Sequence, residues 1–414
     1  MDTLTAAGEG VGADELGSIR NAVAGAFADY LRDLEQLVNT DCGSYTPAGV
    51  DRIGDFVAAF MERAGARVER RPDPAGRLAA TVIGTWDGDR ATPGGPRLLL
   101  IGHMDTVFDE GTCAGRPFSI DADGIARGPG VTDMKSGLLA GLYALKTLAD
   151  RGEPLPFERV TFVANPDEEI GSPSSTPHIR EIAADTDVCL VLECARANGN
   201  IVSSRKGILD ARITIHGRAA HAGVEPEKGR SAVLAAADLV TRIHQLNGRR
   251  DGVTFNVGVI QGGTRPNVVA EQCTLEVDVR AVRRADLEAA EAEIHSLLAS
   301  LAVPDTTAEL TEMARWWPME KLERSGRLVD HAKALAEKLG FTMDDQATGG
   351  ASDANTTSGM GVPSIDGLGP IGGLDHSPDE YLEIASVVPR TSLVASLILA
   401  IGRDPEVRSW RRAG

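Results

Sequence analysis

The chain has 414 residues, which is more than one hydrophobic core usually supports, so two domains are expected. Its 42% apolar and 25% charged residues are typical of a soluble globular protein. The formal net charge of −18 argues against nucleic acid as a partner, because phosphate binding needs a basic surface.

Alternating strands and helices are predicted for the first half of the chain. Residues 1–14 are rich in glycine and are expected to form a disordered N-terminus. Apolar residues at spacings of three and four predict a helix over 15–39, and a second helix runs from Pro47, capped by Thr46, to about Ala64. The remaining elements are strands at 66–69, 78–84, 97–102, 160–165 and 188–192, helices at 138–149 and 178–184, and loops at 86–96 and 107–130. This order predicts an α/β domain with a mainly parallel sheet and helices on both faces.

The pattern changes near residue 208. Strands are predicted at 208–215, 253–260, 268–280 and 307–315, with helices at 226–246 and 285–301. The order strand-helix-strand-strand-helix-strand is the split βαβ, ferredoxin-like arrangement, so residues 208–316 are expected to form an inserted α+β domain. The first pattern then returns, with a helix at 324–339, a loop at 348–356, a strand at 363–368 and a helix at 385–402. Residues 15–207 and 317–414 are therefore predicted to form one discontinuous domain.

Cysteine usage and the chain start predict a cytoplasmic protein. The five cysteines are an odd number without a Cys-x-x-Cys pair, which favours neither a disulfide framework nor a thiolate zinc site. The start lacks the basic and apolar regions of a signal peptide. No apolar stretch is expected to reach the length that a membrane span needs, so no membrane partner is predicted.

His103 follows the apolar strand at 97–102, and ligands collect where strands end at the carboxyl edge of an open α/β sheet. Asp105 stands two residues later, on the same face of an extended chain, where it can accept the second ring N–H. The pair predicts a metal ligand with its orienting carboxylate. A structural histidine is the alternative that these two residues leave open.

Four further residues extend this prediction: Asp133, Glu169, Glu193 and His376, which stand at predicted strand ends or in Gly-rich loops. Imidazoles and carboxylates suit zinc or a similar divalent ion. Three carboxylates and two neutral imidazoles carry three negative charges, so one zinc ion would leave the site anionic and two would leave it slightly positive. We therefore expect two ions roughly 3.5–4 Å apart, bridged by Asp133.

Glu168 directly precedes Glu169, and consecutive loop residues point in different directions. One carboxylate can therefore bind metal while the other faces a water molecule. A general base beside that water is what amide hydrolysis requires. The alternative is a solvated acidic loop over residues 167–169.

Five dispersed motifs carry a resemblance to a known family: Gly102-His103-Met104-Asp105-Thr106-Val107, Gly128-Pro129-Gly130-Val131-Thr132-Asp133-Met134-Lys135, Asp167-Glu168-Glu169-Ile170-Gly171, Gly217-Arg218-Ala219-Ala220-His221-Ala222-Gly223 and Asp375-His376-Ser377. In this order and at these approximate spacings, they resemble the M20 family of zinc peptidases. Within it, the likeness is closest to the glutamate carboxypeptidase (carboxypeptidase G2-like) branch. The resemblance covers the chain from about residue 15 to its end.

The resemblance implies a role for each matched residue of the metal site. His103 and Glu193 would hold one zinc ion, Glu169 and His376 the other, and Asp133 would bridge them. Asp105 would orient His103, and Glu168 would be the catalytic base. A cis peptide bond is implied at Asp133–Met134. Co²⁺ or Mn²⁺ would be substitutes for zinc.

In the inserted domain, the resemblance implies a lid that dimerises. His221 would reach the metal site of a neighbouring subunit, Asn267 would contact substrate, and Arg280 would pair with the free carboxylate of the substrate. Gly350 would belong to a Gly-rich substrate loop. Arg205-Lys206-Gly207 departs from the family pattern, and its cations could recognise an acidic side chain or be solvated at the hinge.

Together these predictions describe a cytoplasmic, homodimeric two-zinc hydrolase that releases a C-terminal amino acid from a peptide or N-acyl substrate. An N-acyl-amino-acid deacylase acting on N-acetyl or N-succinyl compounds uses the same chemistry, so the motifs do not separate the two. A non-catalytic binding protein that kept the fold is a third reading, against which the intact ligand set argues.

Overall fold

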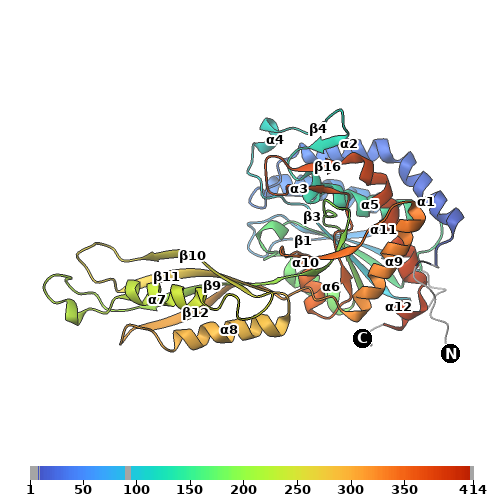
Figure 1. The fold of residues 1–414 in the computed structure, drawn as a ribbon. Helices are drawn as coiled ribbons and strands as arrows, with labels where there is room; N and C mark the ends of the chain where they lie inside the picture. The colour runs from blue at the N-terminus through green and yellow to red at the C-terminus, as the bar shows by residue number, and fades with distance from the viewer. Residues whose placement is uncertain (1–7, 9, 89–94, 411–414) are drawn as a thin grey trace, which may run out of the picture. The chain divides into compact units, whose positions relative to one another are not determined.

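The computed structural model describes residue 8 and residues 10–88 and 95–410 (Figure 1). It divides into two compact units: unit 1 consists of Met1–Ser203, Lys321–Ala347 and Ser352–Gly414, and unit 2 of Ser204–Glu320 and Thr348–Ala351. The inserted unit starts at residue 204 rather than 208 and ends at 320 rather than 316. Residues 348–351, which were predicted to belong to the discontinuous domain, group with unit 2.

The N-terminal segment departs from prediction in two ways. Most of the residues predicted to be disordered lie outside the described part of the chain, but Val11 is buried in the core and the first helix already begins at Ala13. The single helix expected over 15–39 is two helices, α1 (Ala13–Gly25) and α2 (Phe27–Val38). Helix α3 (Pro47–Arg63) begins at the predicted proline, but the side chain of Thr46 makes no capping hydrogen bond.

A six-stranded sheet forms the centre of unit 1, in the order β1 (Arg67–Arg71), β2 (Thr81–Asp87), β6 (Arg159–Asn165), β3 (Arg97–His103), β7 (Val188–Val191) and β14 (Ser364–Ile365). Strands β6, β3, β7 and β14 are parallel neighbours, whereas β2 runs antiparallel to both β1 and β6. The sheet is therefore mixed, with the parallel part where the predicted site residues follow the strands.

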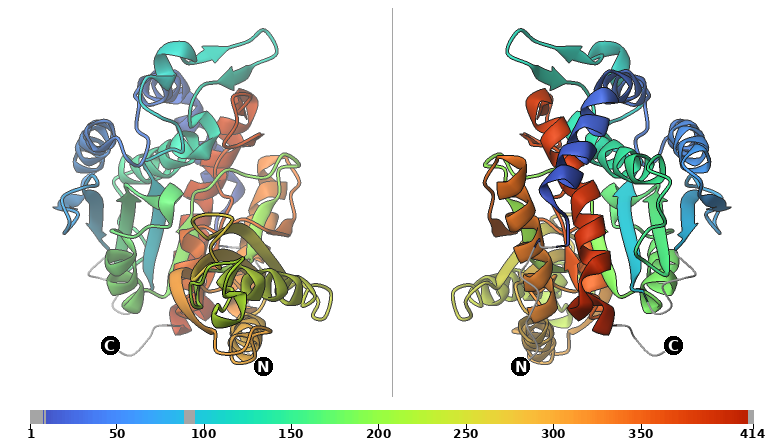
Figure 2. Two further views of the ribbon diagram at one scale, coloured as in Figure 1. Left: turned by 90° about the vertical axis from the view of Figure 1, so that its left-hand side faces the viewer. Right: turned by 90° about the vertical axis from the view of Figure 1, so that its right-hand side faces the viewer.

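Helices cover both faces of this sheet (Figure 2). Leu98 and Leu100 of β3 pack in the large core cluster with helix α5, while Leu99 and Ile101 point to the opposite face, because side chains alternate along a strand. Helix α10 packs on that opposite face against β7 and contacts α6. The other helices of unit 1 are α4 (Thr112–Gly115), α5 (Ser136–Ala149), α6 (Thr176–Ala184), α9 (Glu323–Leu339), α10 (Asp353–Gly359), α11 (Val387–Arg403) and α12 (Pro405–Ser409), with short η helices at Val131–Lys135 (η1), Glu168–Ile170 (η2) and Ile384–Ser386 (η4).

Small sheets occupy segments for which no strand was predicted. One contains β15 (Gly372–Gly373), β16 (Tyr381–Glu383), β5 (Ile125–Arg127) and β4 (Ser119–Ile120), and another pairs β13 (Asp345–Thr348) with β8 (Ile201–Arg205). All of them except β8 have only two to four residues, which is too few to show an apolar period.

Helix α11 corrects the expectation that no stretch is long and apolar enough to cross a membrane. Ile384–Arg403 meets both criteria by length and composition. However, 78% of its apolar window is buried inside the protein, where α11 packs against α1, α5 and α9. A helix that is apolar on all sides is also what the centre of a large core requires.

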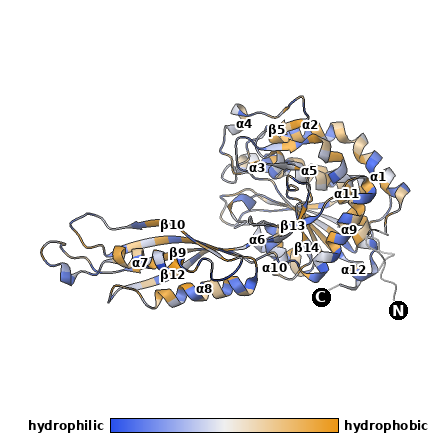
Figure 3. Ribbon diagram, in the orientation of Figure 1, coloured by the Kyte–Doolittle hydropathy of each residue, from blue (hydrophilic) through white to orange (hydrophobic). Residues whose placement is uncertain are grey.

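Unit 2 is a four-stranded antiparallel sheet in the order β10 (Thr254–Gly262), β11 (Gln272–Ala281), β9 (Gly207–His216) and β12 (Thr307–Trp316). Because β11 lies between β9 and β10, the strands have the split βαβ order. Helices α7 (Ala232–His244) and α8 (Arg284–Leu298) bury their apolar sides with the alternate residues of β9 and β11, and a short helix, η3 (Pro226–Lys228), precedes α7. In Figure 3, α8 alternates between hydrophobic and hydrophilic residues, as an amphipathic helix does.

Candidate metal centre

Three parallel strands bring four of the predicted site residues to one edge of the sheet. His103 is the last residue of β3, Glu168 and Glu169 lie in η2 just after β6, and Glu193 follows β7. Strand β3 pairs with both β6 and β7, so the carboxyl ends of all three strands are adjacent. Residues far apart in the sequence are thereby placed together.

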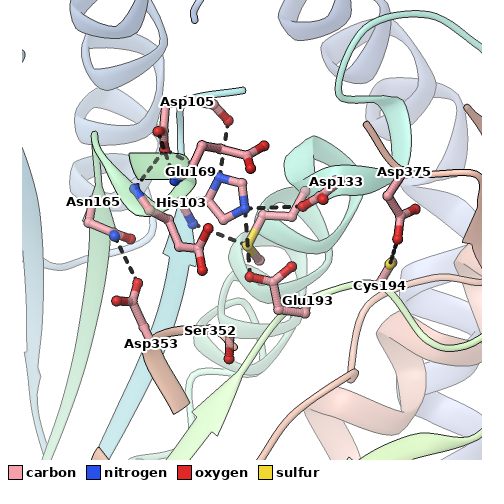
Figure 4. A network of polar contacts seen from close by, with 12 residues as sticks. His103, Asp105, Asp133, Asn165, Glu169, Glu193, Cys194, Ser352, Asp353 and Asp375 are labelled. Atoms are coloured by element: carbon pink, nitrogen blue, oxygen red, sulfur yellow. Dashed lines mark hydrogen bonds and ion pairs between the residues drawn. The ribbon is translucent and has the colours of Figure 1, made fainter. Parts of the chain in front are cut away.

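Asp133 stands between two imidazoles. Its Oδ1 lies 3.2 Å from His103 Nε2, and its Oδ2 lies 3.2 Å from His376 Nε2. Glu193 Oε1 lies 3.6 Å from His103 Nε2, and Glu169 Oε2 lies 3.1 Å from His376 Nε2. The five predicted ligands therefore form one cluster with Asp133 at its centre, and Figure 4 shows the part of it around His103.

The exposure of this cluster differs from one side to the other. His103 is buried, whereas the His376 side chain is 56% exposed, so the cluster is open to solvent on the His376 side. His376 also has a left-handed backbone, with φ of 62°, an uncommon conformation for a residue with a Cβ atom. The peptide bond between Asp133 and Met134 is cis, which confirms that prediction.

Asp105 contacts more groups than the predicted one. Its carboxylate lies 3.4 Å from His103 Nδ1, and its own backbone oxygen is closer to the same nitrogen, at 3.0 Å. The carboxylate also accepts the backbone N–H groups of Glu168 and Glu169, both at 3.2 Å, and the Ser44 hydroxyl at 2.6 Å. Asp105 therefore connects His103 to the turn that carries the two glutamates.

Glu168 lies beside the cluster. Its carboxylate and the ligand atoms of His103 and Glu193 are all within 4.8 Å of one another. Burial is the main cause that raises the pKa of Glu168 well above its usual value, and the carboxylates of Glu193, Asp353 and Glu169 raise it further. A carboxyl group with a raised pKa can accept a proton near neutral pH, as a general base must.

The same carboxylates raise the pKa values of both imidazoles. Burial disfavours the charged form of His103, but Glu193, Asp105 and Asp133 outweigh it and raise the pKa of His103 well above its usual value. Hydrogen bonds to Asp133 and Glu169 raise the pKa of His376 to about 10. The carboxylates of the cluster therefore stabilise positive charge among them.

The donor atoms of this cluster fit a divalent cation. Two groups of side chains could each hold an ion: His103, Asp133 and Glu169, and His103, Glu168 and Glu193. Nitrogen and oxygen donors without a thiolate suit zinc and related divalent ions. The two oxygens of Asp133 face different histidines, which is the arrangement a bridging carboxylate needs.

The predicted substrate residues lie in unit 2. The backbone oxygen of Asn267 accepts the N–H of Ala222, so the segments of His221 and Asn267 are adjacent, and the Nδ1 atom of His221 accepts the N–H of Gly223 at 3.1 Å. The structure thus brings His221 and Asn267 into one group.

A second group in unit 2 contains Arg280 and the Gly-rich loop. Arg280 Nε lies 3.1 Å from both carboxylate oxygens of Asp278, and Nη1 donates to Gly349 O at 3.0 Å. Arg205 Nη1 donates to Gly350 O at 3.1 Å, and this residue is only 5% exposed. The interpretation of Arg205 as a solvated hinge cation is therefore wrong: it holds the loop.

Sequence reasoning missed Glu380. This buried carboxylate accepts the backbone N–H groups of Gly130, Thr132 and Asp133. The available signal was indirect, since a Gly-rich turn with several N–H groups on one side needs an acceptor, and the sequence does not say which residue provides it.

Comparison with known proteins decides the family. The sequence profile of Peptidase family M20/M25/M40 matches residues 99–400. The chain belongs to this family. Family membership makes it a hydrolase, which confirms that prediction.

Relatives and a solved structure agree with this assignment. Carboxypeptidase G2 of Pseudomonas sp. (strain RS-16) is 32% identical over 376 residues, which cover 90% of this chain and 89% of the relative. Acetylornithine deacetylase of Proteus mirabilis (strain HI4320) is 26% identical over 381 residues, which cover 88% and 94%. Aminopeptidase PepT from Bacillus cereus has the same fold, with a TM-score of 0.73 at 24% identity over 90% of this chain and 98% of that chain.

Proposed function

We propose that this protein is a two-zinc hydrolase that cleaves an amide bond next to a free carboxylate and releases a C-terminal amino acid. The observation that carries the proposal is the position of Asp133, with one carboxylate oxygen toward His103 and the other toward His376. Glu193 and Glu169 complete the two halves of the cluster. Members of this family are typically metal-dependent, which fits this donor set.

The protein's own residues have distinct tasks in this reaction. Two zinc ions, when bound, would polarise the scissile carbonyl and make a water molecule acidic. Glu168 takes a proton from that water and delivers it to the leaving nitrogen. Asp105 keeps His103 and the turn of Glu168 and Glu169 in place through the contacts described above.

Arg280 is proposed to bind the free carboxylate of the substrate. Its side chain is 36% exposed, and its guanidinium is oriented by Asp278 and Gly349. Nη2 makes no hydrogen bond within the part of the chain that the structure describes, so it can donate to a substrate oxygen. A guanidinium suits carboxylate recognition because its planar donors match the two oxygens.

A carboxypeptidase is our first choice and an N-acyl-amino-acid deacylase the second. The 32% identity to carboxypeptidase G2 favours the first, and the 26% identity to acetylornithine deacetylase supports the second. Release of free amino acids from dipeptides, from N-acetyl and N-succinyl amino acids and from their C-terminal amides separates these functions. Cleavage of the amides as fast as the free acids would contradict the role given to the carboxylate. Failure on every substrate by the zinc-loaded protein would favour a binding protein.

A homodimer formed through unit 2 is part of the proposal. Strand β10 is at the edge of its sheet, and Ile260 on it is half exposed, as is Leu234 on α7. An edge strand with exposed apolar side chains favours pairing with a second copy. In such a dimer His221 would stabilise the oxyanion at the partner's site, and Asn267 and Gly350 would contact substrate. We place the protein in the cytoplasm, in agreement with its five free, buried cysteines.

Replacing Arg280 with lysine is expected to raise KM roughly 10- to 100-fold, because a point charge replaces a donor pair worth about 1.5–3 kcal/mol. Turnover at saturating substrate should change much less. Steady-state kinetics on the best substrate of the panel measures both. Arg212→Lys, on the neighbouring strand β9 and paired with Glu276, is the matched control. An unchanged KM in Arg280→Lys would exclude Arg280 from carboxylate binding.

A further inference from the structure

Glu380 makes an unusual set of contacts for a residue outside the ligand cluster. It is 1% exposed, and both of its carboxylate oxygens accept backbone N–H groups of one loop. Oε2 accepts from Gly130 at 2.9 Å, and Oε1 accepts from Thr132 at 2.9 Å and from Asp133 at 3.0 Å. The last of these donors belongs to the residue at the centre of the cluster.

The loop is shaped to receive this carboxylate. Gly130 has a left-handed backbone with φ of 69°, and a Cβ atom there would lie 2.5 Å from Thr106 Cγ2. A turn of this kind can direct several N–H groups into one concavity, which binds an anion. Here the anion is a side chain of the same protein.

The segment that carries Glu380 also carries His376. Residues 374–380 connect β15 to β16, and β16 pairs with β5, which leads into the loop of Asp133. Arg127 Nη1 at the end of β5 donates to Asp379 O at 3.1 Å, which adds a contact between the two segments. One hairpin therefore supplies His376 and holds the backbone of Asp133.

We propose that Glu380 is a positioning residue for the metal centre, which directs the Asp133 carboxylate so that its two oxygens face His103 and His376. The inference rests on the proposed function, because it assigns Glu380 a role in placing the bridging ligand. Glu380 does not touch substrate or metal. It acts through the backbone of the loop that ends in Asp133.

The Glu380→Gln variant tests whether Glu380 directs Asp133 or only fills space. The amide has nearly the same shape, but only one of its two terminal atoms can accept a hydrogen bond. The NH2 group would face either the N–H of Gly130 or the N–H groups of Thr132 and Asp133. In either orientation the variant keeps the packing and loses at least one of the three backbone hydrogen bonds that hold the loop of Asp133.

The test compares zinc binding to the metal-free full-length wild type, Glu380→Gln and Glu383→Gln. Glu383 lies in the same strand region, and its side chain makes no hydrogen bond within the described residues, so its variant controls for loss of charge. Calorimetric titration with Zn²⁺ should show roughly 10- to 100-fold weaker binding in Glu380→Gln only, as for other residues that orient metal ligands. Added Zn²⁺ should restore kcat with KM unchanged, and the visible spectrum of the Co²⁺-loaded variant should differ from that of the wild type.

Equal zinc affinity of Glu380→Gln and wild type, with only a lower melting temperature, would overturn this inference and leave the proposed function standing. No zinc uptake by the wild type would overturn both. Glu380→Asp keeps the charge on a shorter side chain, and we expect its zinc affinity to lie between those of Glu380→Gln and wild type. If neither variant folds, Glu380 stabilises the fold and the positioning role is rejected.

Discussion

Glu168→Gln is expected to lose nearly all turnover while it keeps its metal. Loss of a general base lowers kcat by roughly 100- to 10,000-fold, because glutamine cannot accept the proton of the attacking water. The shape of the side chain is retained, and the neighbouring ligands His103 and Glu193 are unchanged, so zinc content and KM should remain close to wild type. Steady-state kinetics together with metal analysis of the purified protein measures both quantities.

The same variant also distinguishes a base from a ligand. The Glu168 carboxylate is within 4.8 Å of the ligand atoms of His103 and Glu193, which geometry alone would also allow for a metal ligand. Loss of zinc together with activity would make Glu168 a ligand, and unchanged turnover would exclude it from the reaction. Glu153→Gln, which removes a glutamate that is 61% exposed, is the control for the loss of one negative charge.

Asp133→Asn is expected to reduce bound zinc from two ions per chain to one or none, and to abolish activity. An asparagine side chain offers one oxygen, whereas Asp133 directs an oxygen to each of the two histidines. Burial works against the charged form of Asp133, but hydrogen bonds from His103 and His376 lower its pKa well below the usual range. These hydrogen bonds therefore favour the ionised carboxylate, which is the form that binds metal.

The stability of Asp133→Asn should depend on zinc in a specific way. In the wild type, zinc at about 100 times its dissociation constant should stabilise the fold by about 2.7 kcal/mol per site, and the variant should lose most of this gain. Without zinc the variant should be less stable than the wild type, because it loses the ion pairs that Asp133 makes with His103 and His376. Melting temperatures with Zn²⁺ and with a chelator test this, with Asp123→Asn, an exposed position, as control. Two zinc ions retained by Asp133→Asn would contradict the bridging role.

Three of the five predicted ligands could be placed together because they mark the ends of strands. His103, Glu169 and Glu193 each follow a short apolar run, and parallel strands in one sheet end at one edge. Local sequence was therefore enough to expect that these side chains meet. The same local patterns led to the wrong expectation that no stretch as long and apolar as α11 is present. Composition does not distinguish an apolar helix at the centre of a core from one that crosses a membrane.

Sequence by itself determined the alternation of strands and helices, the inserted split βαβ unit and the candidate donor residues of the cluster, because these follow from periodicity and residue chemistry. Only the tertiary structure decided that Glu380 holds the Asp133 loop, that Asp105 holds the turn of Glu168 and Glu169, and that Arg205 holds the Gly-rich loop. Each of these contacts joins a buried charged side chain to backbone groups far away in the sequence. No local pattern encodes such a partner, because any buried N–H or C=O group can serve once the fold brings it near.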